Sequence, residues 1–282
     1  MDFWQLRGRA LALDRPRVVG ILNVTPDSFS DGGRFREAGP ALARARELAA
    51  AGADLIDVGG ESTRPGADPV SPDEEAARVL PVIRLLRDAL DLPLSVDTRR
   101  AAVAREALAA GAHAVNDVSA LGDPEMLRAV AESGAGLVLM HMRGTPRDMQ
   151  EHAVYRDVAH EVTDELAVPL RRAELAGIAP ARVVVDPGIG FAKTAEQNLE
   201  LIARLQVLAR LGRPILLGPS RKAFIGALLG GAAPDARDAG TAGACVAGLA
   251  RGARIFRVHD VRITRHALDV AFAILRAAPE AP

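Results

Sequence analysis

The sequence predicts a (β/α)8 barrel on three observations. Eight short apolar runs rich in Val, Ile and Leu recur along the chain, each followed by a stretch with helical spacing. Several helical stretches end in a glycine where a left-handed cap is expected, at Gly52, Gly111, Gly134 and Gly177. No linker or change of composition interrupts the 282 residues. Residues 1–282 are therefore predicted to form a single barrel domain, with a doubly wound sheet as the alternative.

The apolar runs and the helical spacing give the order of the elements. The predicted strands span residues 18–23, 54–59, 93–97, 114–118, 136–141, 182–186, 214–218 and 254–258. The predicted helices span residues 37–51, 72–90, 100–110, 124–133, 154–176, 194–211, 221–250 and 260–277. The residues before Val18 are expected to form a short N-terminal extension, a hairpin that covers the bottom of the barrel.

Composition narrows the class of partner. The formal net charge of −1 favours neither nucleic acid nor an anionic membrane surface. No apolar run approaches the roughly 20 residues of a membrane span, and the N-terminus lacks the pattern of a secretory signal. The only cysteine, Cys245, excludes an intrachain disulfide and a cysteine-based zinc site. We therefore expect a cytoplasmic location and small-molecule substrates.

Polar residues appear where each predicted strand ends. In a barrel all these ends meet on one face, where catalytic sites are built. Capping of the next helix explains any single strand-end Asp or Asn, but not a polar residue after every strand. The residues that follow this pattern include Asn23, Glu61, Asp97, Asn116, His141, Asp186, Ser220, Arg257 and His259.

The strand-end residues divide into two chemical sets. Asp97, Asn116, Asp186 and Lys222 suit a heterocycle with amino, imino and carbonyl groups on one edge, because carboxylates accept paired N–H bonds. The second set suits an anion and contains Asn23, Arg64, Arg257 and His259. Asn23 would also be an oxygen ligand for a magnesium ion shared with phosphates. A heterocycle that carries a phosphate or diphosphate is the ligand predicted from residue types.

Two polar loops and the two lysines complete the candidate features. Residues 25–33 are rich in turn-forming residues around Phe29, an aromatic expected to cover a bound ligand, and residues 61–68 form the second loop. The basic residues comprise 33 Arg and only 2 Lys, Lys193 and Lys222. Lys193 is expected to be exposed at a helix N-terminus. Arg99 and Arg100 are expected to be solvated, and His141 to be buried and structural.

Long motifs in this chain resemble those of dihydropteroate synthases. Residues 23–33 (Asn-Val-Thr-Pro-Asp-Ser-Phe-Ser-Asp-Gly-Gly) resemble the first family signature, and residues 57–67 (Asp-Val-Gly-Gly-Glu-Ser-Thr-Arg-Pro-Gly-Ala) resemble the second. Shorter matches follow in the family's order over nearly the whole chain, at residues 95–98, 116–118, 140–142, 186–191, 220–222 and 257–260.

The resemblance implies roles for individual residues. Asp97, Asp186, Lys222, Arg257 and His259 are expected to be catalytic. The pterin would lie against Asp97, Asn116, Met140, Asp186, Phe191 and Lys222. The diphosphate would be held by Asn23, Thr63, Arg64, Arg257 and His259, with Mg2+ at Asn23. The p-aminobenzoate pocket would be formed by Phe29, Thr63, Arg64 and Ser220, and Asp31 would act in loop closure.

The reaction implied by the resemblance joins 6-hydroxymethyl-7,8-dihydropterin diphosphate to p-aminobenzoate in folate biosynthesis. It is an SN1-like substitution that releases pyrophosphate and is the target of sulfonamides. Relatives are commonly homodimers. Three alternatives remain open at this point: a pterin-binding paralogue without turnover, a methyltetrahydrofolate–corrinoid methyltransferase, and a Schiff-base aldolase that uses Lys222.

Overall fold

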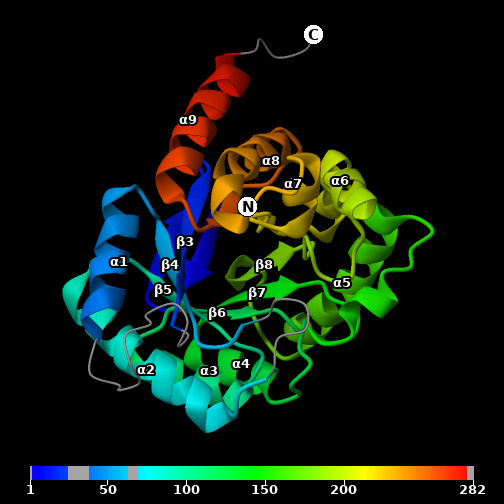
Figure 1. Ribbon diagram of the computed structural model, residues 1–282. Coiled ribbons are helices and arrows are strands. Elements are labelled where there is room, and N and C mark those ends of the chain that lie inside the picture. The colour runs from blue at the N-terminus through cyan, green and yellow to red at the C-terminus, as the bar shows by residue number, and fades with distance from the viewer. Residues whose placement is uncertain (1, 25–37, 63–68, 278–282) are drawn as a thin grey trace.

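The computed structural model describes residues 2–24, 38–62 and 69–277. Its strands are β1 (Phe3–Leu6), β2 (Arg9–Ala12), β3 (Arg17–Asn23), β4 (Leu55–Gly59), β5 (Leu94–Asp97), β6 (Ala114–Asp117), β7 (Gly136–Met140), β8 (Val183–Asp186), β9 (Leu216–Leu217) and β10 (Ile255–Val258). Its α-helices are α1 (Ala38–Ala50), α2 (Pro72–Ala89), α3 (Ala101–Ala110), α4 (Met126–Ser133), α5 (Val158–Leu175), α6 (Ala195–Ala203), α7 (Ala223–Leu228), α8 (Asp238–Ala250) and α9 (Val261–Ala277). The helices surround the strands, as Figure 1 shows.

Eight parallel strands form the predicted barrel. Their order in the sheet is β8-β7-β6-β5-β4-β3-β10-β9, and every neighbouring pair is parallel. The two edge strands meet through a parallel bridge between Val185 and Ile215, where Val185 N–H donates to the Pro214 carbonyl at 3.0 Å. The sheet is therefore a nearly closed barrel, and the doubly wound alternative is wrong.

The N-terminal extension is the predicted hairpin. β1 pairs antiparallel with β2, and Trp4 and Leu6 pack against inward residues of the barrel strands such as Val19 and Leu55. Trp4 Nε1 donates to the carbonyl of Arg182, the residue before β8, at 2.9 Å. Because these contacts lie at the amino ends of the strands, the hairpin fills the bottom of the barrel. The opposite end is left for polar side chains.

The long helix predicted over residues 221–250 is wrong. The chain forms α7, then a 3-10 turn at Pro234–Arg237, and then α8. Gly230 and Gly231 between them have φ values of 67° and 89°, and Pro234 cannot donate a helical hydrogen bond. Periodicity predicts helical content here, but the glycine pair breaks the helix.

Candidate active site

Polar side chains from neighbouring strands meet at the carboxyl end of the barrel. Strand register places Asp97 beside Gly59 of β4 on one side and beside Asn116 of β6 on the other. Asp186 ends β8, and the positive charges of Lys222 and Arg257 lie close enough to lower the pKa of its carboxyl group. A Cβ atom on Gly218 would lie only 3.7 Å from Asp186 Oδ2. The heterocycle-binding set predicted from the sequence is thus brought together in one place.

Arg257 is the centre of a partly buried hydrogen-bond network. Its Nε donates to Asp57 Oδ2 and its Nη2 to Asp97 Oδ2, both at 2.6 Å. Asp57 Oδ2 also accepts from Asn116 Nδ2 at 3.1 Å, and Asp57 Oδ1 accepts from the Ser95 hydroxyl. Asp57 is 1% exposed. A carboxylate that was not predicted as a site residue therefore holds two residues that were.

The charges in this network shift its pKa values. Burial raises the pKa of Asp97 to about 7, against the charge of Arg257 and with the help of the charge of Asp57. Burial opposes protonation of Arg257, but the charges of Asp57 and Asp97 outweigh it and raise the pKa of Arg257. The two directions are compatible because one cation faces two carboxylates. Arg257 therefore stays ionised, and Asp97 takes up a proton near neutral pH.

Asp186 is a buried carboxyl group whose pKa also lies close to neutral pH. Burial raises its pKa to about 6, although the Gly188 N–H and the charge of Lys222 oppose this shift. Gly188 N donates to Asp186 Oδ1 at 2.7 Å. Asp97 and Asp186 therefore offer the pocket two carboxyl groups that accept hydrogen bonds when ionised and donate them when protonated.

An apolar wall flanks these carboxyl groups. Met140 and Phe191 are buried in a small cluster with Val118, Met149 and Ala192. The Lys222 ammonium lies 3.9 Å from the centroid of the Phe191 ring, a cation–π contact. A Cβ atom on Gly190 would lie 2.8 Å from Lys222 Cδ, so the loop packs closely on the lysine stem. An apolar surface beside carboxyl groups suits a flat ring with a polar edge.

Ser220 and His259 form a separate pair at the ends of β9 and β10. Ser220 Oγ lies 2.9 Å from His259 Nδ1 and accepts from the His259 backbone N–H at 3.0 Å. Ser220 is buried. These two contacts connect the residues after β9 to those after β10, and they keep both side chains at the carboxyl end of the barrel, as predicted.

Comparison with known proteins assigns the family. The family model for "Pterin binding enzyme" matches residues 19–259. A dihydropteroate synthase of a Synechocystis species is 48% identical over 93% of this chain and 91% of its own length. That of Escherichia coli K12 is 45% identical over 96% of both chains. The chain belongs to the dihydropteroate synthase family of pterin-binding enzymes.

Solved structures of this family have the same fold. A Xanthomonas albilineans dihydropteroate synthase with 4-aminobenzoic acid superposes with a TM-score of 0.92, at 48% identity over 99% of both chains. The enzyme of the same organism in complex with 7,8-dihydropteroate gives a TM-score of 0.88, at 45% identity over 98% of this chain and 100% of that chain. Both are barrels of a family in which pterin and arylamine ligands have been observed.

The part of the dihydropteroate synthase signatures that forms the two loops is not described. Phe29, Asp31, Thr63 and Arg64 lie outside the described residues. Asn23 ends β3, and a Cβ atom on Gly59 would lie 3.7 Å from both Asn23 Oδ1 and Asp97 Oδ2. Two oxygen atoms therefore flank Gly59. Within residues 2–24, 38–62 and 69–277 no group of three His, Cys, Asp or Glu residues could hold a metal ion.

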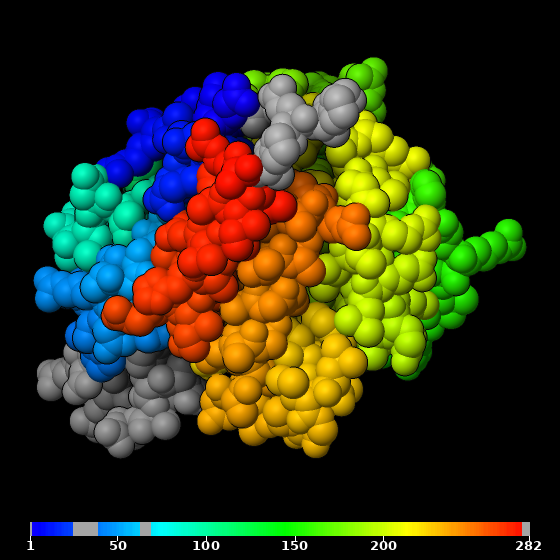
Figure 2. Space-filling model, turned by 90° about the horizontal axis from the view of Figure 1, so that it is seen from above, coloured from blue at the N-terminus to red at the C-terminus, as the bar shows by residue number. Residues whose placement is uncertain are grey.

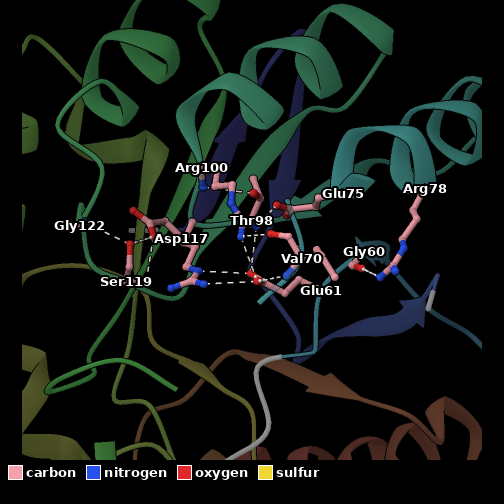
Figure 3. A network of polar contacts seen from close by, with 11 residues as sticks. Gly60, Glu61, Val70, Glu75, Arg78, Thr98, Arg100, Asp117, Ser119 and Gly122 are labelled. Atoms are coloured by element: carbon pink, nitrogen blue, oxygen red, sulfur yellow. Dashed lines mark hydrogen bonds and ion pairs between the residues drawn. The ribbon is translucent and has the colours of Figure 1, made fainter. Parts of the chain in front are cut away.

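A network of ion pairs joins the described ends of the second loop (Figure 3). Arg100 donates to both Glu61 oxygens at 3.0 and 3.1 Å and to the Val70 carbonyl at 2.6 Å, and it also pairs with the fully buried Glu75. Arg99 donates to Glu61 as well, at 3.2 and 3.3 Å. The expectation that Arg99 and Arg100 are solvated is therefore wrong, because both are drawn in by the buried carboxylate of Glu61.

Lys193 also departs from expectation. It is 3% exposed, and its ammonium lies 2.9 Å from the Phe191 carbonyl and 3.1 Å from both the Gly188 carbonyl and His141 Nδ1. The predicted exposed position is wrong, since the loop after β8 folds over this side chain. His141 is buried as predicted, and its Nε2 lies 2.9 Å from Glu165 Oε2. Lys193 thus ties the loop after β8, which carries Gly188 and Phe191, to His141 at the end of β7.

The described residues contain no helix with the length and apolar character of a membrane span.

Proposed function

We propose that the chain is a dihydropteroate synthase. It would condense 6-hydroxymethyl-7,8-dihydropterin diphosphate with p-aminobenzoate to give 7,8-dihydropteroate and pyrophosphate. Solved relatives bind 4-aminobenzoic acid and 7,8-dihydropteroate, the nucleophile and the product of this reaction. Sulfonamide sensitivity is part of the proposal, since a Yersinia pestis relative, 44% identical over 98% of this chain, is described in a sulfonamide drug complex.

The observation that carries the proposal is that hydrogen-bond acceptors outnumber donors among the residues expected to bind the pterin. Asp186 is buried and the Asp97 side chain is 11% exposed, and the buried Asn116 Oδ1 has no hydrogen-bond partner among the described residues. Three acceptors in one place suit the N–H groups along one edge of a pterin, and Lys222 supplies a donor. A buried acceptor without a partner costs about 1–3 kcal/mol, so a ligand that donates to it would gain from binding.

The reaction is a substitution at the pterin methylene carbon. The C–O bond breaks and its electron pair leaves with the diphosphate, so the pterin methylene becomes cationic. The aniline nitrogen of p-aminobenzoate then forms the new C–N bond and loses a proton. Arg257 and His259 would stabilise the leaving diphosphate, and the negative charge around Asp97 and Asp186 would stabilise the cationic ring. None of these steps requires a side-chain nucleophile.

The proposal includes a magnesium ion, which Asn23 would help to hold. Mg2+ commonly takes one or two protein oxygens and several phosphate or water oxygens. The Asn23 amide oxygen beside Gly59 fits this use, because it ends a barrel strand next to the pterin residues. The bound ion would neutralise charge on the leaving group.

The alternatives are not favoured. A methyltetrahydrofolate–corrinoid methyltransferase would not need the diphosphate residues Arg257 and His259. A Schiff-base aldolase would need Lys222 as nucleophile, whereas its ammonium lies over the Phe191 ring. Borohydride trapping with substrate tests the aldolase, and turnover tests the paralogue without activity.

The decisive experiment mixes the protein with the pterin diphosphate, p-aminobenzoate and Mg2+. Equal amounts of dihydropteroate and pyrophosphate are expected, with turnover lost in Asp186→Asn and in Arg257→Ala. Chelation by EDTA should abolish turnover and added Mg2+ should restore it. Pterin binding without either product would support the non-catalytic paralogue and overturn the proposed reaction.

We also propose a homodimer formed through α9, and a cytoplasmic location. Ile263, Val270 and Ile274 are 43, 63 and 66% exposed and recur at a helical spacing on α9, which lies on the surface beside α8 (Figure 2). Apolar side chains gathered on one helix face are typical of a protein interface. Sedimentation should give a dimer, and Val270→Arg/Ile274→Arg should give a monomer. A wild-type monomer at micromolar concentration would overturn this proposal.

A further inference from the structure

Asp57 is a buried carboxylate in the middle of an apolar strand. All five residues of β4 are buried, and Asp57 is the only charged one. Its two oxygens accept three hydrogen bonds, from Ser95 on β5, Asn116 on β6 and Arg257 on β10. A buried carboxylate is costly unless it is paired and hydrogen-bonded, so these donors explain how Asp57 is tolerated. They do not explain what Asp57 does.

The chemistry of a carboxylate decides how Asn116 is oriented. An ionised carboxylate only accepts hydrogen bonds, whereas an amide has one donating and one accepting end. Asn116 must therefore turn its Nδ2 toward Asp57, at 3.1 Å, and its Oδ1 away. That oxygen is buried and has no hydrogen-bond partner in the described part of the chain. Asn116 thus presents an acceptor, not a donor, to whatever occupies the pocket.

The same carboxylate orients Arg257. Its Nε bond to Asp57 and its Nη2 bond to Asp97 fix the plane of the guanidinium between two strands. Without Asp57 the guanidinium would be held by Asp97 alone and could turn toward solvent or toward an anion. Two side chains with predicted roles in binding are therefore held by one residue beneath them.

We propose that Asp57 is a positioning residue that sets the hydrogen-bond polarity of the pterin pocket. Asp57 accepts a hydrogen bond from Asn116 Nδ2 and so leaves Asn116 Oδ1 as the third acceptor of the pocket, beside Asp97 and Asp186. The pocket then selects a heterocycle with N–H donors along the edge that faces Asn116. The inference rests on the proposed function, because it assigns Asp57 to the pterin half of that site.

The test measures binding of 6-hydroxymethyl-7,8-dihydropterin, which carries the ring without the diphosphate. Asp57→Leu keeps a side chain of similar size that accepts nothing, so its Kd should rise at least tenfold. Asp57→Asn keeps an accepting oxygen for Asn116 and Arg257 and can turn its NH2 to Ser95. Its Kd should stay within about fivefold of the wild-type value. Asp57→Leu with wild-type affinity would overturn the inference, as would an Asp57→Asn loss equal to that of Asp57→Leu.

A double-mutant cycle separates positioning from a purely structural role. If Asp57 acts through Asn116, Asp57→Leu should weaken ring binding by less than about threefold in an Asn116→Ala background. Equal losses in both backgrounds would overturn the inference. Thr163→Val is a matched control, because it removes a buried hydrogen bond to Ala159 on α5, outside the barrel interior, and should leave the Kd unchanged.

Misfolding of a variant can be distinguished from failure of the inference and from failure of the proposed function. Circular dichroism and thermal melting report whether Asp57→Leu folds, and if it does not, Asp57→Asn in the two Asn116 backgrounds decides the matter. The small loss of ring affinity caused by Asp57→Asn should disappear in the Asn116→Ala background. A loss of affinity that is the same in both backgrounds would overturn the inference. Wild-type protein that neither binds the ring nor forms product would instead overturn the proposed function.

Discussion

The half-buried Arg257 and the buried Lys193 are two cations near the carboxyl ends of the barrel strands, and they are stabilised by different means. Arg257 lies between the carboxylates of Asp57 and Asp97, so its pKa is raised in spite of burial. Lys193 contacts two carbonyl groups and a histidine, and burial lowers its pKa to about 7 against the more distant charges of Asp186 and Glu165. Paired burial preserves a charge, and burial among neutral partners weakens it.

His141, the histidine beside Lys193, is also kept neutral by burial. Burial, and then the charge of Lys193, lower the pKa of His141 to about 4, although Glu165 opposes the shift. A neutral imidazole can donate from Nε2 to Glu165 and accept at Nδ1 from Lys193. The Lys193 site is therefore a chain of hydrogen bonds that orders a loop. The Arg257 site is a charged centre that can act on a ligand.

Removing Arg257 should have the largest effect on stability. Arg257→Leu leaves the buried Asp57 and the half-buried Asp97 without their cation, which should cost about 3–5 kcal/mol of unfolding free energy at pH 7.5. Urea unfolding should show a smaller loss of unfolding free energy at pH 5, because Asp97 is then protonated and no longer carries a negative charge. The control is Arg128→Leu, which breaks an exposed pair with Glu132 and should leave the unfolding free energy nearly unchanged. Equal losses in the two variants would show that the buried pairing contributes little.

Removing Lys193 should have an intermediate effect. Lys193→Met keeps the length of the side chain but leaves the carbonyls of Gly188 and Phe191 without this donor, at a cost of about 1–3 kcal/mol at pH 9. The folded pKa of Lys193 lies below its unfolded value, so its contribution is present at high pH and is lost as pH falls through about 7. Urea unfolding should therefore show a smaller loss at pH 6. A larger loss at pH 6 than at pH 9 would contradict this sign.

Asp97 should show the opposite pH dependence. Its folded pKa lies above the unfolded value, so the folded state holds more protons between about pH 4 and pH 7. The stability of the wild type relative to Asp97→Asn should fall across that window, by about 1 kcal/mol or more. Unfolding curves at pH 4.5, 6 and 7.5 measure the difference. A wild-type advantage that grows with pH would mean that the pairing with Arg257 outweighs burial.

The smallest expected effect concerns the distant charge of Glu165. Because the chain has only two lysines, a protein labelled with carbon-13 at lysine Cε should give two lysine signals. The signal of Lys193, assigned with Lys193→Met, should titrate near pH 7. Glu165→Gln removes a charge that raises the pKa of Lys193, and should lower that pKa by less than about one unit. An upward shift would contradict the assigned role of Glu165.

Much of the barrel could be predicted from local sequence. Runs of Val, Ile and Leu give the strands to within one or two residues at most ends, and each glycine cap gives the helix-to-strand join. The carboxyl-end set of Asp97, Asn116 and Asp186 follows from the same pattern, because all parallel strands end on one face. The missed residue Asp57 carried a signal too, since a charged residue in an otherwise apolar strand calls for buried partners.

Sequence patterns could not predict which side chains are buried together. Lys193, Arg99 and Arg100 lie beside predicted helix starts, where exposure is the ordinary outcome. A folded loop nevertheless buries Lys193, and pairing with Glu61 leaves both arginines only partly exposed. The bond between Asp57 and Arg257 joins residues 200 positions apart. The composition and periodicity of the chain thus specify the barrel and the face that carries the site. Tertiary structure alone decides the charge states and hydrogen-bond polarity of that site, because burial and pairing depend on distant neighbours.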